Sequence, residues 1–423
     1  MDARHGDAVP AGTRRPVDQT AMRAHNLGLV LRYVRDHGSC SRAQIGAATR
    51  LTTPAVTKIV ADLLRRGLLE ETGPVQVRGR GRPASMLRLH GRGLTAVGVE
   101  IRVDHVGVLV RDFAGTELAS GRRPLSVDPS PRAAVRMAAA LVDEALDRSG
   151  RADAVGCGVA LPALVDAHDG TAVGAHWASW NGVPIRDLLA DALGERCGVL
   201  GLDSAARLAA LATSRLGEFR GSHQLVHLEV GAGAGVGATT GGALFTGAHG
   251  YAGAFGHIPM DPRGPVCTCG GAGCLNAIIG FPAFARDLGD QAGADECVDY
   301  ARYAQEVAAR IRAGDATARE AVERLGRWLG RAVAILVNLL DPDTVTVGGY
   351  VLHLQPWLMD AARAEVAARV RSLGWPGGRL EASPLTDQAA LLGAVTLALE
   401  HVFADPTTVA ATAAQGSSGR RTR

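Results

Sequence analysis

Apolar residues recur at helical spacing in two short stretches near the start of the chain. From Asn26 onward, Leu27, Val30, Leu31 and Val34 lie at helical spacing and predict an amphipathic helix that ends at Gly38. A second predicted helix begins at Ser41, where the serine is followed three residues later by glutamine, the pattern of a capping box. Only a short connection therefore separates the two helices.

The next stretch predicts a third helix with one polar and one apolar side. Thr52 or Thr53 provides the N-cap, Pro54 lies in the first turn, where its missing N–H is harmless, and Gly67 ends the helix. The apolar side consists of Val56, Ile59, Val60, Leu63 and Leu64. This order of helices is typical of a helix-turn-helix motif, whose recognition helix enters the major groove of DNA. The residues expected to contact DNA are Ser41 and Arg42 of the second helix and Thr52, Thr53, Ala55, Thr57 and Lys58 of the third.

Two short stretches of alternating apolar residues follow the third helix and flank a tip rich in glycine and arginine. The tip reads VRGRGRPA and contains no acidic residue. This pattern predicts a β-hairpin that forms the wing of a winged helix. We expect Arg80 and Arg82 at the tip to enter a narrow minor groove, where the negative potential of DNA is enhanced. The alternative interpretation is a basic hairpin that only faces solvent.

The distribution of charge favours a nucleic-acid partner for this first segment. Residues 21–92 contain 13 Lys and Arg against four Asp and Glu, a net charge of +9, whereas residues 93–423 carry −6. A basic segment attached to a mildly acidic body is typical of a domain that binds a polyanion. Double-stranded DNA is therefore the expected partner.

After the wing, the chain alternates short apolar strands with helical stretches rich in alanine and leucine. Helices are predicted over 132–148 and 318–340, and the predicted strands include AVGVEI, VGVLVRD, AVGCGVALP, QLVHLEVG and DTVTVGG. This alternation is typical of an α/β fold. Gly231, Gly233 and Gly235 form a turn between two strands, which fits either a phosphate-binding loop or a plain hairpin turn.

One loop carries a complete set of metal ligands. The stretch GHIPMDPRGPVCTCGGAGCLN supplies His257, Cys267, Cys269 and Cys274. One imidazole and three thiolates form a full tetrahedral set for Zn²⁺, and because no coordination position stays open, the predicted site is structural and not catalytic. The alternative is a set of free core thiols beside an unrelated histidine. The remaining cysteines are scattered, which argues against a disulfide framework: Cys40, Cys157, Cys197 and Cys297.

The length of 423 residues predicts two or three compact domains. No apolar run reaches the ~18 to 20 residues of a membrane span, and the first residues lack the apolar stretch of a signal peptide, so we expect a soluble, cytoplasmic protein. Both ends of the chain have the composition of disordered tails. The predicted division is a disordered tail at 1–20, a winged helix-turn-helix at 21–92, an α/β domain at 93–403 and a disordered tail at 404–423.

The two halves together resemble the ROK family, which is named for repressors, open reading frames and kinases. The resemblance covers about residues 21 to 402. One part of it is the stretch SRAQIGAATRLTTPAVTKIVADLLRRGLLEE with its GRGRPA wing. The other part is GHIPMDPRGPVCTCGGAGCL, which is similar to the family's zinc signature. The resemblance implies an N-terminal α/β winged helix-turn-helix and an actin-like (sugar kinase or ribonuclease H-like) α/β domain. Two lobes of that domain would surround a sugar, with ATP beside it in the kinases, and a helix near 385–402 would pack on the first lobe.

The resemblance also indicates which nucleotide contacts this chain lacks. Kinases of the family begin with an Asp-x-Gly-Gly-Thr phosphate loop, and the matching positions here hold Glu100 and, at the first glycine, Arg102. The second phosphate loop survives as Gly231 and Gly233 with alanine in place of threonine, while Gly348 and its neighbour match glycines near the adenosine. Because an arginine side chain takes the space that a phosphate needs, we expect no ATP turnover and no catalytic residue.

Several sugar contacts of the family are also replaced. Asp203 matches the catalytic base, but both asparagines of that motif are apolar here, and Asp203 has an alternative role as the N-cap of the following helix. Ala254 and Asn276 stand where the family has glutamates. The loss of four such groups, each worth about 0.5 to 3 kcal/mol, predicts poor affinity for common hexoses. The remaining candidates for effector binding are Asp203, His257, Asn276, Trp180 and Asn181.

Three functions remain open from the sequence. The favoured hypothesis is a transcriptional regulator, most simply a repressor, that binds operator DNA as a homodimer or homotetramer and responds to a sugar or sugar derivative. An active sugar kinase with a DNA-binding arm is the second hypothesis, and a module that binds a protein partner is the third.

Overall fold

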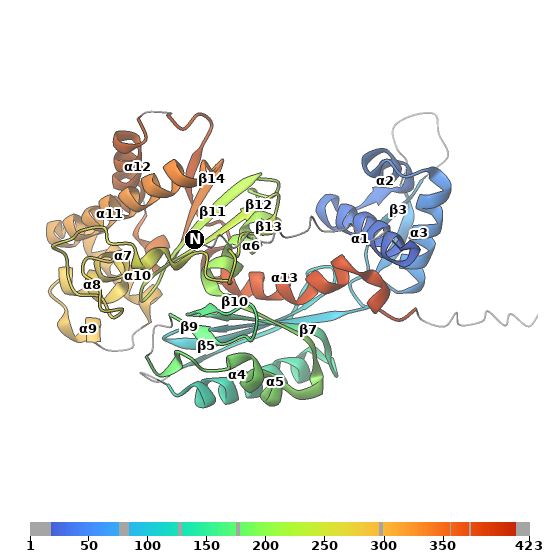
Figure 1. Cartoon of the computed structure of the whole chain (residues 1–423), viewed down its shortest axis with the longest axis horizontal. Helices are drawn as coiled ribbons and strands as arrows, with labels where there is room; N and C mark the ends of the chain where they lie inside the picture. The colour runs from blue at the N-terminus through green and yellow to red at the C-terminus, as the bar shows by residue number, and fades with distance from the viewer. Residues whose placement is uncertain are drawn as a thin grey trace, which may run out of the picture. The chain divides into compact units, whose positions relative to one another are not determined.

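The computed structural model describes residues 18–75, 84–125, 129–174, 178–295, 299–355, 357–371 and 374–411. The chain divides into two compact units (Figure 1). The first combines Met1–His90 with His401–Arg423 and is called the DNA-binding unit after the role expected from its sequence; the second is Gly91–Glu400 and is called the effector unit for the same reason. The predicted division placed residues from 404 onward in a separate tail, whereas the structure groups the described residues 405–411 with the N-terminal segment.

The DNA-binding unit contains three helices and a three-stranded sheet. The helices are α1 (Gln19–His37), α2 (Arg42–Thr49) and α3 (Thr53–Arg65), and the strands are β1 (Cys40–Ser41), β2 (Leu69–Val75) and β3 (Ala84–Leu89). The sheet order is β1-β3-β2, with β2 and β3 antiparallel. All three predicted helices and both wing strands are present. The first helix begins earlier than predicted, because Asp18 caps it by accepting from the Thr20 N–H.

Local signals explain why these helices begin where they do. Ser41 and Gln44 form the predicted capping box, with each side chain bonded to the other's backbone N–H. Thr52 is the N-cap of α3 by its extended backbone, although its side chain makes no capping bond. Most of the apolar positions that the sequence indicated are completely or almost completely buried: Leu27, Val30, Leu31, Val34, Val56, Val60 and Leu63. Ile59 and Leu64, predicted on the apolar side of the third helix, are only half-buried. Ile45 of α2 is also completely buried.

The last described residues of the chain are part of the DNA-binding unit. Helix α13 (Ala389–Ala404) ends here and is followed by the 3₁₀ turn η6 (Pro406–Thr408). The Arg66 guanidinium donates to the backbone oxygens of Thr407 (3.1 Å) and Val409, and Arg32 donates to the Phe403 oxygen (2.7 Å). The structured chain therefore extends beyond residue 404, where the sequence predicted a disordered tail to begin.

The effector unit contains two five-stranded sheets. The first has the order β10-β7-β4-β5-β6 and the second β13-β12-β11-β14-β15. In each sheet the first three strands in sequence form an antiparallel meander, and the last two add in parallel. The strands of the first sheet are β4 (Thr95–Ile101), β5 (His105–Asp112), β6 (Glu117–Pro124), β7 (Ala154–Leu161) and β10 (Cys197–Ser204). Those of the second are β11 (Gln224–Val230), β12 (Ala234–Thr240), β13 (Ala243–Leu244), β14 (Thr344–Gly349) and β15 (Arg379–Ala382).

A small hairpin and a set of helices complete this unit. The hairpin pairs β8 (Leu164–Val165) with β9 (Ala172–Val173). The α-helices are α4 (Pro131–Ser149), α5 (Ile185–Leu193), α6 (Ala205–Arg215), α7 (Leu275–Ile279), α8 (Phe281–Asp287), α9 (Gln291–Asp295), α10 (Tyr300–Arg312), α11 (Ala316–Leu340) and α12 (Trp357–Arg369). The 3₁₀ turns are η1 (Ala178–Trp180), η2 (Gly194–Arg196), η3 (Ala254–His257), η4 (Tyr350–Leu354) and η5 (Thr386–Gln388).

Helices cover the first sheet on both faces (Figure 1). Helices α4 and α5 lie on one face, and the residues of α13 that belong to this unit lie on the other. A Cβ atom at Gly158 would collide with the Ala394 backbone, and one at Gly98 would lie 2.7 Å from the Val395 side chain. Glycine is therefore required for this close approach. This packing confirms the prediction that the C-terminal helix lies on the first lobe.

No helix in the described part of the chain is long and apolar enough to cross a membrane.

Candidate functional site

The N-terminal half of α3 presents a polar face to solvent. Thr52, Thr53, Thr57 and Lys58 are exposed and Ala55 is half-buried, while the apolar side of the helix packs into the core. The Thr57 hydroxyl donates to the Thr53 oxygen at 2.9 Å, which fixes its rotamer on this face. Short hydroxyls beside one ammonium can reach base edges and phosphates in a major groove. The structure thus gathers the predicted recognition residues on one surface.

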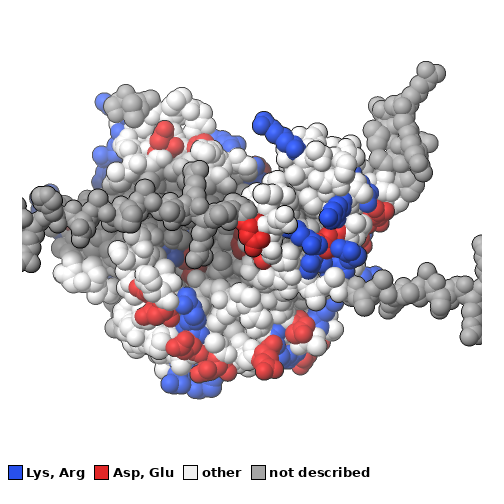
Figure 2. Space-filling view, turned by 45° about the vertical axis from the view of Figure 1, so that its right-hand side comes forward, with Lys and Arg blue, Asp and Glu red and all other residues white. Residues whose placement is uncertain are grey.

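The other residues predicted to contact DNA already bond to groups of the chain itself or lie outside the described residues. Ser41 is half-buried in its capping box, and Arg42 pairs with Glu71 of β2 at 2.5 Å. Arg80 and Arg82 lie outside the described residues. Acidic and basic side chains are interspersed over the visible face of the molecule (Figure 2), so the net charge of the first segment does not by itself locate a DNA-binding surface.

One buried carboxylate in α3 organises several arginines away from the polar face. Asp62 lies 2.6 Å from Arg23 of α1, 3.0 Å from Arg65 and 3.3 Å from Arg66. Burial opposes ionisation of Asp62, but the three guanidiniums outweigh it and lower its pKa. Asp62 therefore ties the end of α3 to α1 and orients Arg66, the side chain that binds the C-terminal segment.

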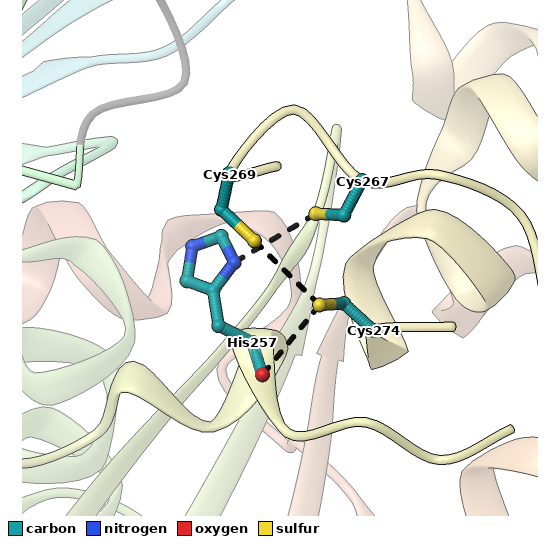
Figure 3. Close-up of side chains that lie close together, drawn as sticks. All are labelled: His257, Cys267, Cys269 and Cys274. Atoms are coloured by element: carbon teal, nitrogen blue, oxygen red, sulfur yellow. Dashed lines mark hydrogen bonds between the residues drawn. The ribbon is translucent and has the colours of Figure 1, made fainter. Parts of the chain in front are cut away.

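The predicted metal ligands converge on one point (Figure 3). The ligand atoms of His257, Cys267, Cys269 and Cys274 all lie within 4.8 Å of one another. Cys269 Sγ is 3.6 Å from Cys274 Sγ, and Cys267 Sγ is 3.8 Å from His257 Nδ1. Zinc–sulfur bonds of 2.3 Å and zinc–nitrogen bonds of about 2.0 Å in a tetrahedron place ligand atoms roughly 3.5 to 3.8 Å apart. The four residues can therefore bind a metal ion.

The backbone of the loop brings these ligands together. His257 ends η3, Cys274 precedes α7, and a backbone bridge joins the two flanks between Pro259 and Cys274. Gly273 adopts a φ of 64°, and a Cβ there would collide with the Asp261 backbone. The tight turn before Cys274 therefore requires glycine, which explains the glycine-rich spacing of the motif.

Asp203 is buried in an ion pair that the sequence did not predict. Its Oδ1 accepts from the Ser204 N–H at 2.6 Å and from Arg207 Nε at 2.5 Å, and Arg207 also donates to the Gly250 oxygen at 2.6 Å. Burial raises the pKa of Asp203, and Arg207 only partly opposes this effect. The N-cap of α6 is Ser204, so the alternative interpretation of Asp203 as the cap is wrong.

This pair changes what Asp203 can do chemically. A general base must reach the proton that it removes. Here Asp203 Oδ1 is held by Arg207, the first charged residue of an alanine-rich helix, and both side chains are almost completely buried. Arg207 is the functional residue that the sequence analysis missed. Its spacing of four residues from Asp203 was the available signal, since residues at i and i+4 adjoin across a helix turn.

The remaining effector candidates do not form one surface. Asn276 Oδ1 accepts from the Ala234 N–H at 2.6 Å, so this side chain stabilises the turn between β11 and β12. Trp180 is completely buried and its indole N–H donates to the Pro129 oxygen at 2.9 Å, which places it in the core and not in a ligand site. Asn181 is exposed, and His257 belongs to the metal cluster.

The positions matched to the nucleotide site hold paired charges. Arg102 donates to Glu100 and to Glu229, each at 3.2 Å. Burial raises the pKa of Glu100, and Arg102 only partly opposes this. Gly231–Gly233 form the predicted turn between β11 and β12, and Gly348 lies at the end of β14.

Comparisons with known proteins agree with this organisation. Models of the ROK family and the MarR family match residues 96–401 and 28–81, respectively. The xylose repressor of Caldicellulosiruptor bescii is 23% identical over 398 residues, 92% of this chain and 99% of that protein. A crystal structure of a ROK family transcriptional regulator, a homologue of the E. coli MLC protein, has a TM-score of 0.74 at 22% identity and covers 90% of this chain and 97% of that chain.

A kinase of known structure is also similar. The ROK family glucokinase from Streptomyces griseus, solved with glucose and AMPPNP, has a TM-score of 0.63 at 26% identity and covers 72% of this chain and 99% of that chain. Together these likenesses confirm the predicted fold class, a winged helix-turn-helix followed by an actin-like domain of two α/β lobes.

Proposed function

Since the chain belongs to the ROK family, we propose that it is a sequence-specific DNA-binding transcriptional regulator that acts as a repressor. The observation that carries this proposal is the exposed polar face at the start of α3, in a segment that matches the MarR family. A relative that matches nearly the whole chain, the xylose repressor, supports repression as the mode of action. The site of action is the cytoplasm, where the operator DNA lies.

DNA binding would use the second helix of the motif in the major groove and the wing beside it. The hydroxyls of Thr52, Thr53 and Thr57 suit base edges and phosphates, the Ala55 methyl suits a thymine methyl, and Lys58 supplies a phosphate contact. Ser41 and Arg42 at the start of α2 adjoin this surface as secondary contacts.

A binding titration on the intergenic DNA next to the protein's own gene tests this proposal. At near-physiological salt with excess competitor, we expect a discrete complex, and Lys58→Ala should weaken it about tenfold and reduce the salt slope by about one. Arg319→Ala, which removes one exposed positive charge from α11 in the effector unit, is the matched control and should leave affinity unchanged. Salt-sensitive binding that competitor abolishes would contradict a sequence-specific regulator.

The wing has its own test. The double variant Arg80→Ala with Arg82→Ala should weaken binding most at operators flanked by A·T-rich DNA, because narrow minor grooves attract arginine. Equal affinity on every flank would remove the proposed role of these two residues.

The effector unit is proposed to bind a ligand without phosphorylating it. The ion pair at Asp203 and the arginine at position 102 support the absence of kinase activity. The glucokinase likeness keeps an active sugar kinase with a DNA-binding arm as the alternative. A coupled assay for ADP release over a panel of hexoses decides between them: no turnover is expected, and turnover with any hexose would establish the kinase.

The ligand is proposed to be a sugar or sugar derivative that shifts the population of DNA-binding conformations. Asp203, His257, Asn276 and Asn181 are the candidate contacts, and the burial of Trp180 makes it the weakest of the set. The DNA titration repeated with single sugars, including xylose, tests this, because a true effector changes operator affinity while an inert sugar does not.

The metal is proposed to be a structural Zn²⁺ held by His257, Cys267, Cys269 and Cys274, since two thiolate-rich edges of the cluster match tetrahedral spacing. When bound, it would crosslink the loop between η3 and α7. Metal analysis of the purified protein should give about one zinc per chain.

The protein is proposed to act as a homodimer or homotetramer, so that two winged helices meet a pseudo-palindromic operator. Helix α11 and the metal loop expose Leu339 and Val266 (70% and 80% accessible). Contact with a second copy of the chain would cover these two apolar side chains. Sedimentation velocity should show a dimer or larger, and a monomer would contradict the proposal.

A further inference from the structure

A single arginine connects the two sheets of the effector unit. Arg102 follows β4 of the first sheet, and its Nη1 donates to Glu100 of the same strand and to Glu229 of β11 in the second sheet, both at 3.2 Å. Its Nε lies 3.8 Å from Asp104. The Arg102 side chain is only 18% exposed, so little solvent screens these interactions.

The network continues inside the second sheet. Glu229 Oε2 lies 3.0 Å from His227 Nε2, and His227 Nδ1 lies 2.9 Å from the Thr346 hydroxyl of β14. His227 and Thr346 are completely buried. Burial opposes ionisation of Glu229, but the hydrogen bond from His227 and the charge of Arg102 outweigh it and lower its pKa. Glu229 is therefore an ionised carboxylate that contacts Arg102 with one oxygen and His227 with the other.

This network contacts the glycine segments that the family resemblance assigns to nucleotide binding. A Cβ on Gly231 would lie 3.6 Å from Arg102 Nη2, and one on Gly348 would meet Glu229 and lie 2.7 Å from the His227 ring. Arg102 itself stands at a third such position. The chain's own charged side chains thus fill the space between these segments.

Both side chains of the Arg102–Glu229 pair are largely buried, with 18% and 13% of their surface exposed. Breaking a buried pair by removing one partner is strongly destabilising, because the other charge stays buried without compensation.

We propose that the Arg102–Glu229 pair is an inter-lobe latch, which holds the two sheets of the effector unit together. The latch goes beyond the proposed function, since it concerns how the two lobes are joined and applies whether or not the protein binds DNA.

A double-mutant cycle on the full chain tests the latch. Arg102→Gln and Glu229→Gln should each lower the thermal midpoint of the effector unit by about 5 °C, and the double variant should lose clearly less than both losses combined. Hydrogen exchange at the amides of residues 231–235 should increase at least about fivefold in either single variant. The same cycle on Arg123 and Glu144, an exposed pair within the first lobe, is the matched control and should show almost no coupling.

The outcomes are distinct from those of the DNA titration, because neither readout involves DNA. Strictly additive midpoints with unchanged exchange at 231–235 would overturn the latch. If Arg102→Gln does not fold, Arg102→Lys takes its place in the cycle, since lysine keeps the charge but has only one donor centre.

Discussion

The metal cluster and the Asp203–Arg207 pair both bring polar groups together in the effector unit, but only the second contains groups of opposite charge. The ligand atoms of the metal cluster converge within 4.8 Å, and no side chain of opposite charge is among them. Asp203 and Arg207 also converge, and they neutralise each other at 2.5 Å. The first cluster can accept a metal ion from outside, whereas Asp203 in the second already has its partner within the chain.

The comparison teaches how to distinguish a cluster that can take up a metal ion from one whose charges are already paired. Buried charges are tolerated when they are paired or bound to a metal. Where the partner is another side chain, the group offers little to a ligand. Where several metal-ligating groups converge without an opposite charge, a cation can bind. By the same criterion, Arg102 and its carboxylates are a position whose charges are already paired.

Loss of the metal ligands should have the largest effect. Cys274→Ser should reduce the zinc content to near zero and destabilise the effector unit by several kcal/mol, because metal binding at such sites is worth roughly 10 to 16 kcal/mol in isolated peptides. Metal analysis and thermal unfolding measure both. Cys157→Ser, at a buried thiol outside the cluster, is the control and should retain zinc. Equal zinc content in Cys274→Ser would contradict the assigned ligands.

Loss of Arg207 should have the next largest effect. Arg207→Ala leaves Asp203 buried without its partner and should lower the free energy of unfolding by about 3 to 5 kcal/mol near neutral pH. Burial already raises the pKa of Asp203 in the folded chain. The penalty should therefore be full well above that pKa and shrink as pH falls through it, since protonation removes the unpaired charge.

Denaturant titrations of Arg207→Ala at pH 8 and pH 5, for example, measure this trend. Adding Asp203→Asn to Arg207→Ala should recover part of the loss at the higher pH, because no ionised group then remains buried. If the loss of stability caused by Arg207→Ala grew toward acid pH, the ionised Asp203 carboxylate would not be the group that Arg207 stabilises.

Loss of one neutral hydrogen bond should matter less. Asn276→Ala removes the acceptor of the Ala234 N–H and should lower stability by about 1 to 3 kcal/mol, depending on whether water replaces the acceptor. If Asn276 also binds a sugar effector, the same variant loses the ligand response of operator affinity. A normal response in this variant would leave only its structural role.

Exposed ion pairs should contribute least to stability, and they provide a reference for the buried pairs. Arg319 and Glu323 lie 2.9 Å apart on α11, with 60% and 36% of their side chains accessible. Their double-mutant coupling should be about 0.3 to 0.5 kcal/mol and should decrease with added salt. A coupling as large as that of Asp203 with Arg207 would mean that burial is not what separates the two kinds of pair.

Much of the fold follows from local signals in the sequence. The capping box at Ser41, the apolar spacing of α3 and the glycine that ends it fixed the second and third helices correctly, because these signals act within one helix. The metal cluster was also predictable, since its four ligands lie within 18 residues of one loop and their chemistry is specific.

The buried ion pairs and the unit boundaries were harder to predict because they depend on contacts that no local pattern encodes. The partner of Arg102 lies 127 residues away at Glu229, and Arg66 binds a carbonyl 341 residues away at Thr407. The early start of α1 at Gln19 depended on one aspartate cap in an otherwise unpatterned segment. Sequence periodicity identifies which residues are buried, but not which partners meet across the fold.

The membership of residues 401–411 in the DNA-binding unit has a consequence for biosynthesis. The helix-turn-helix segment leaves the ribosome first, but the carbonyls that receive Arg66 are among the last to be made. At about 5 to 20 residues per second, the intervening 341 residues take roughly 20 to 70 seconds to translate. A nascent or prematurely terminated chain therefore has an incomplete DNA-binding unit, which is completed only after residues Gly91–Glu400 have been synthesised.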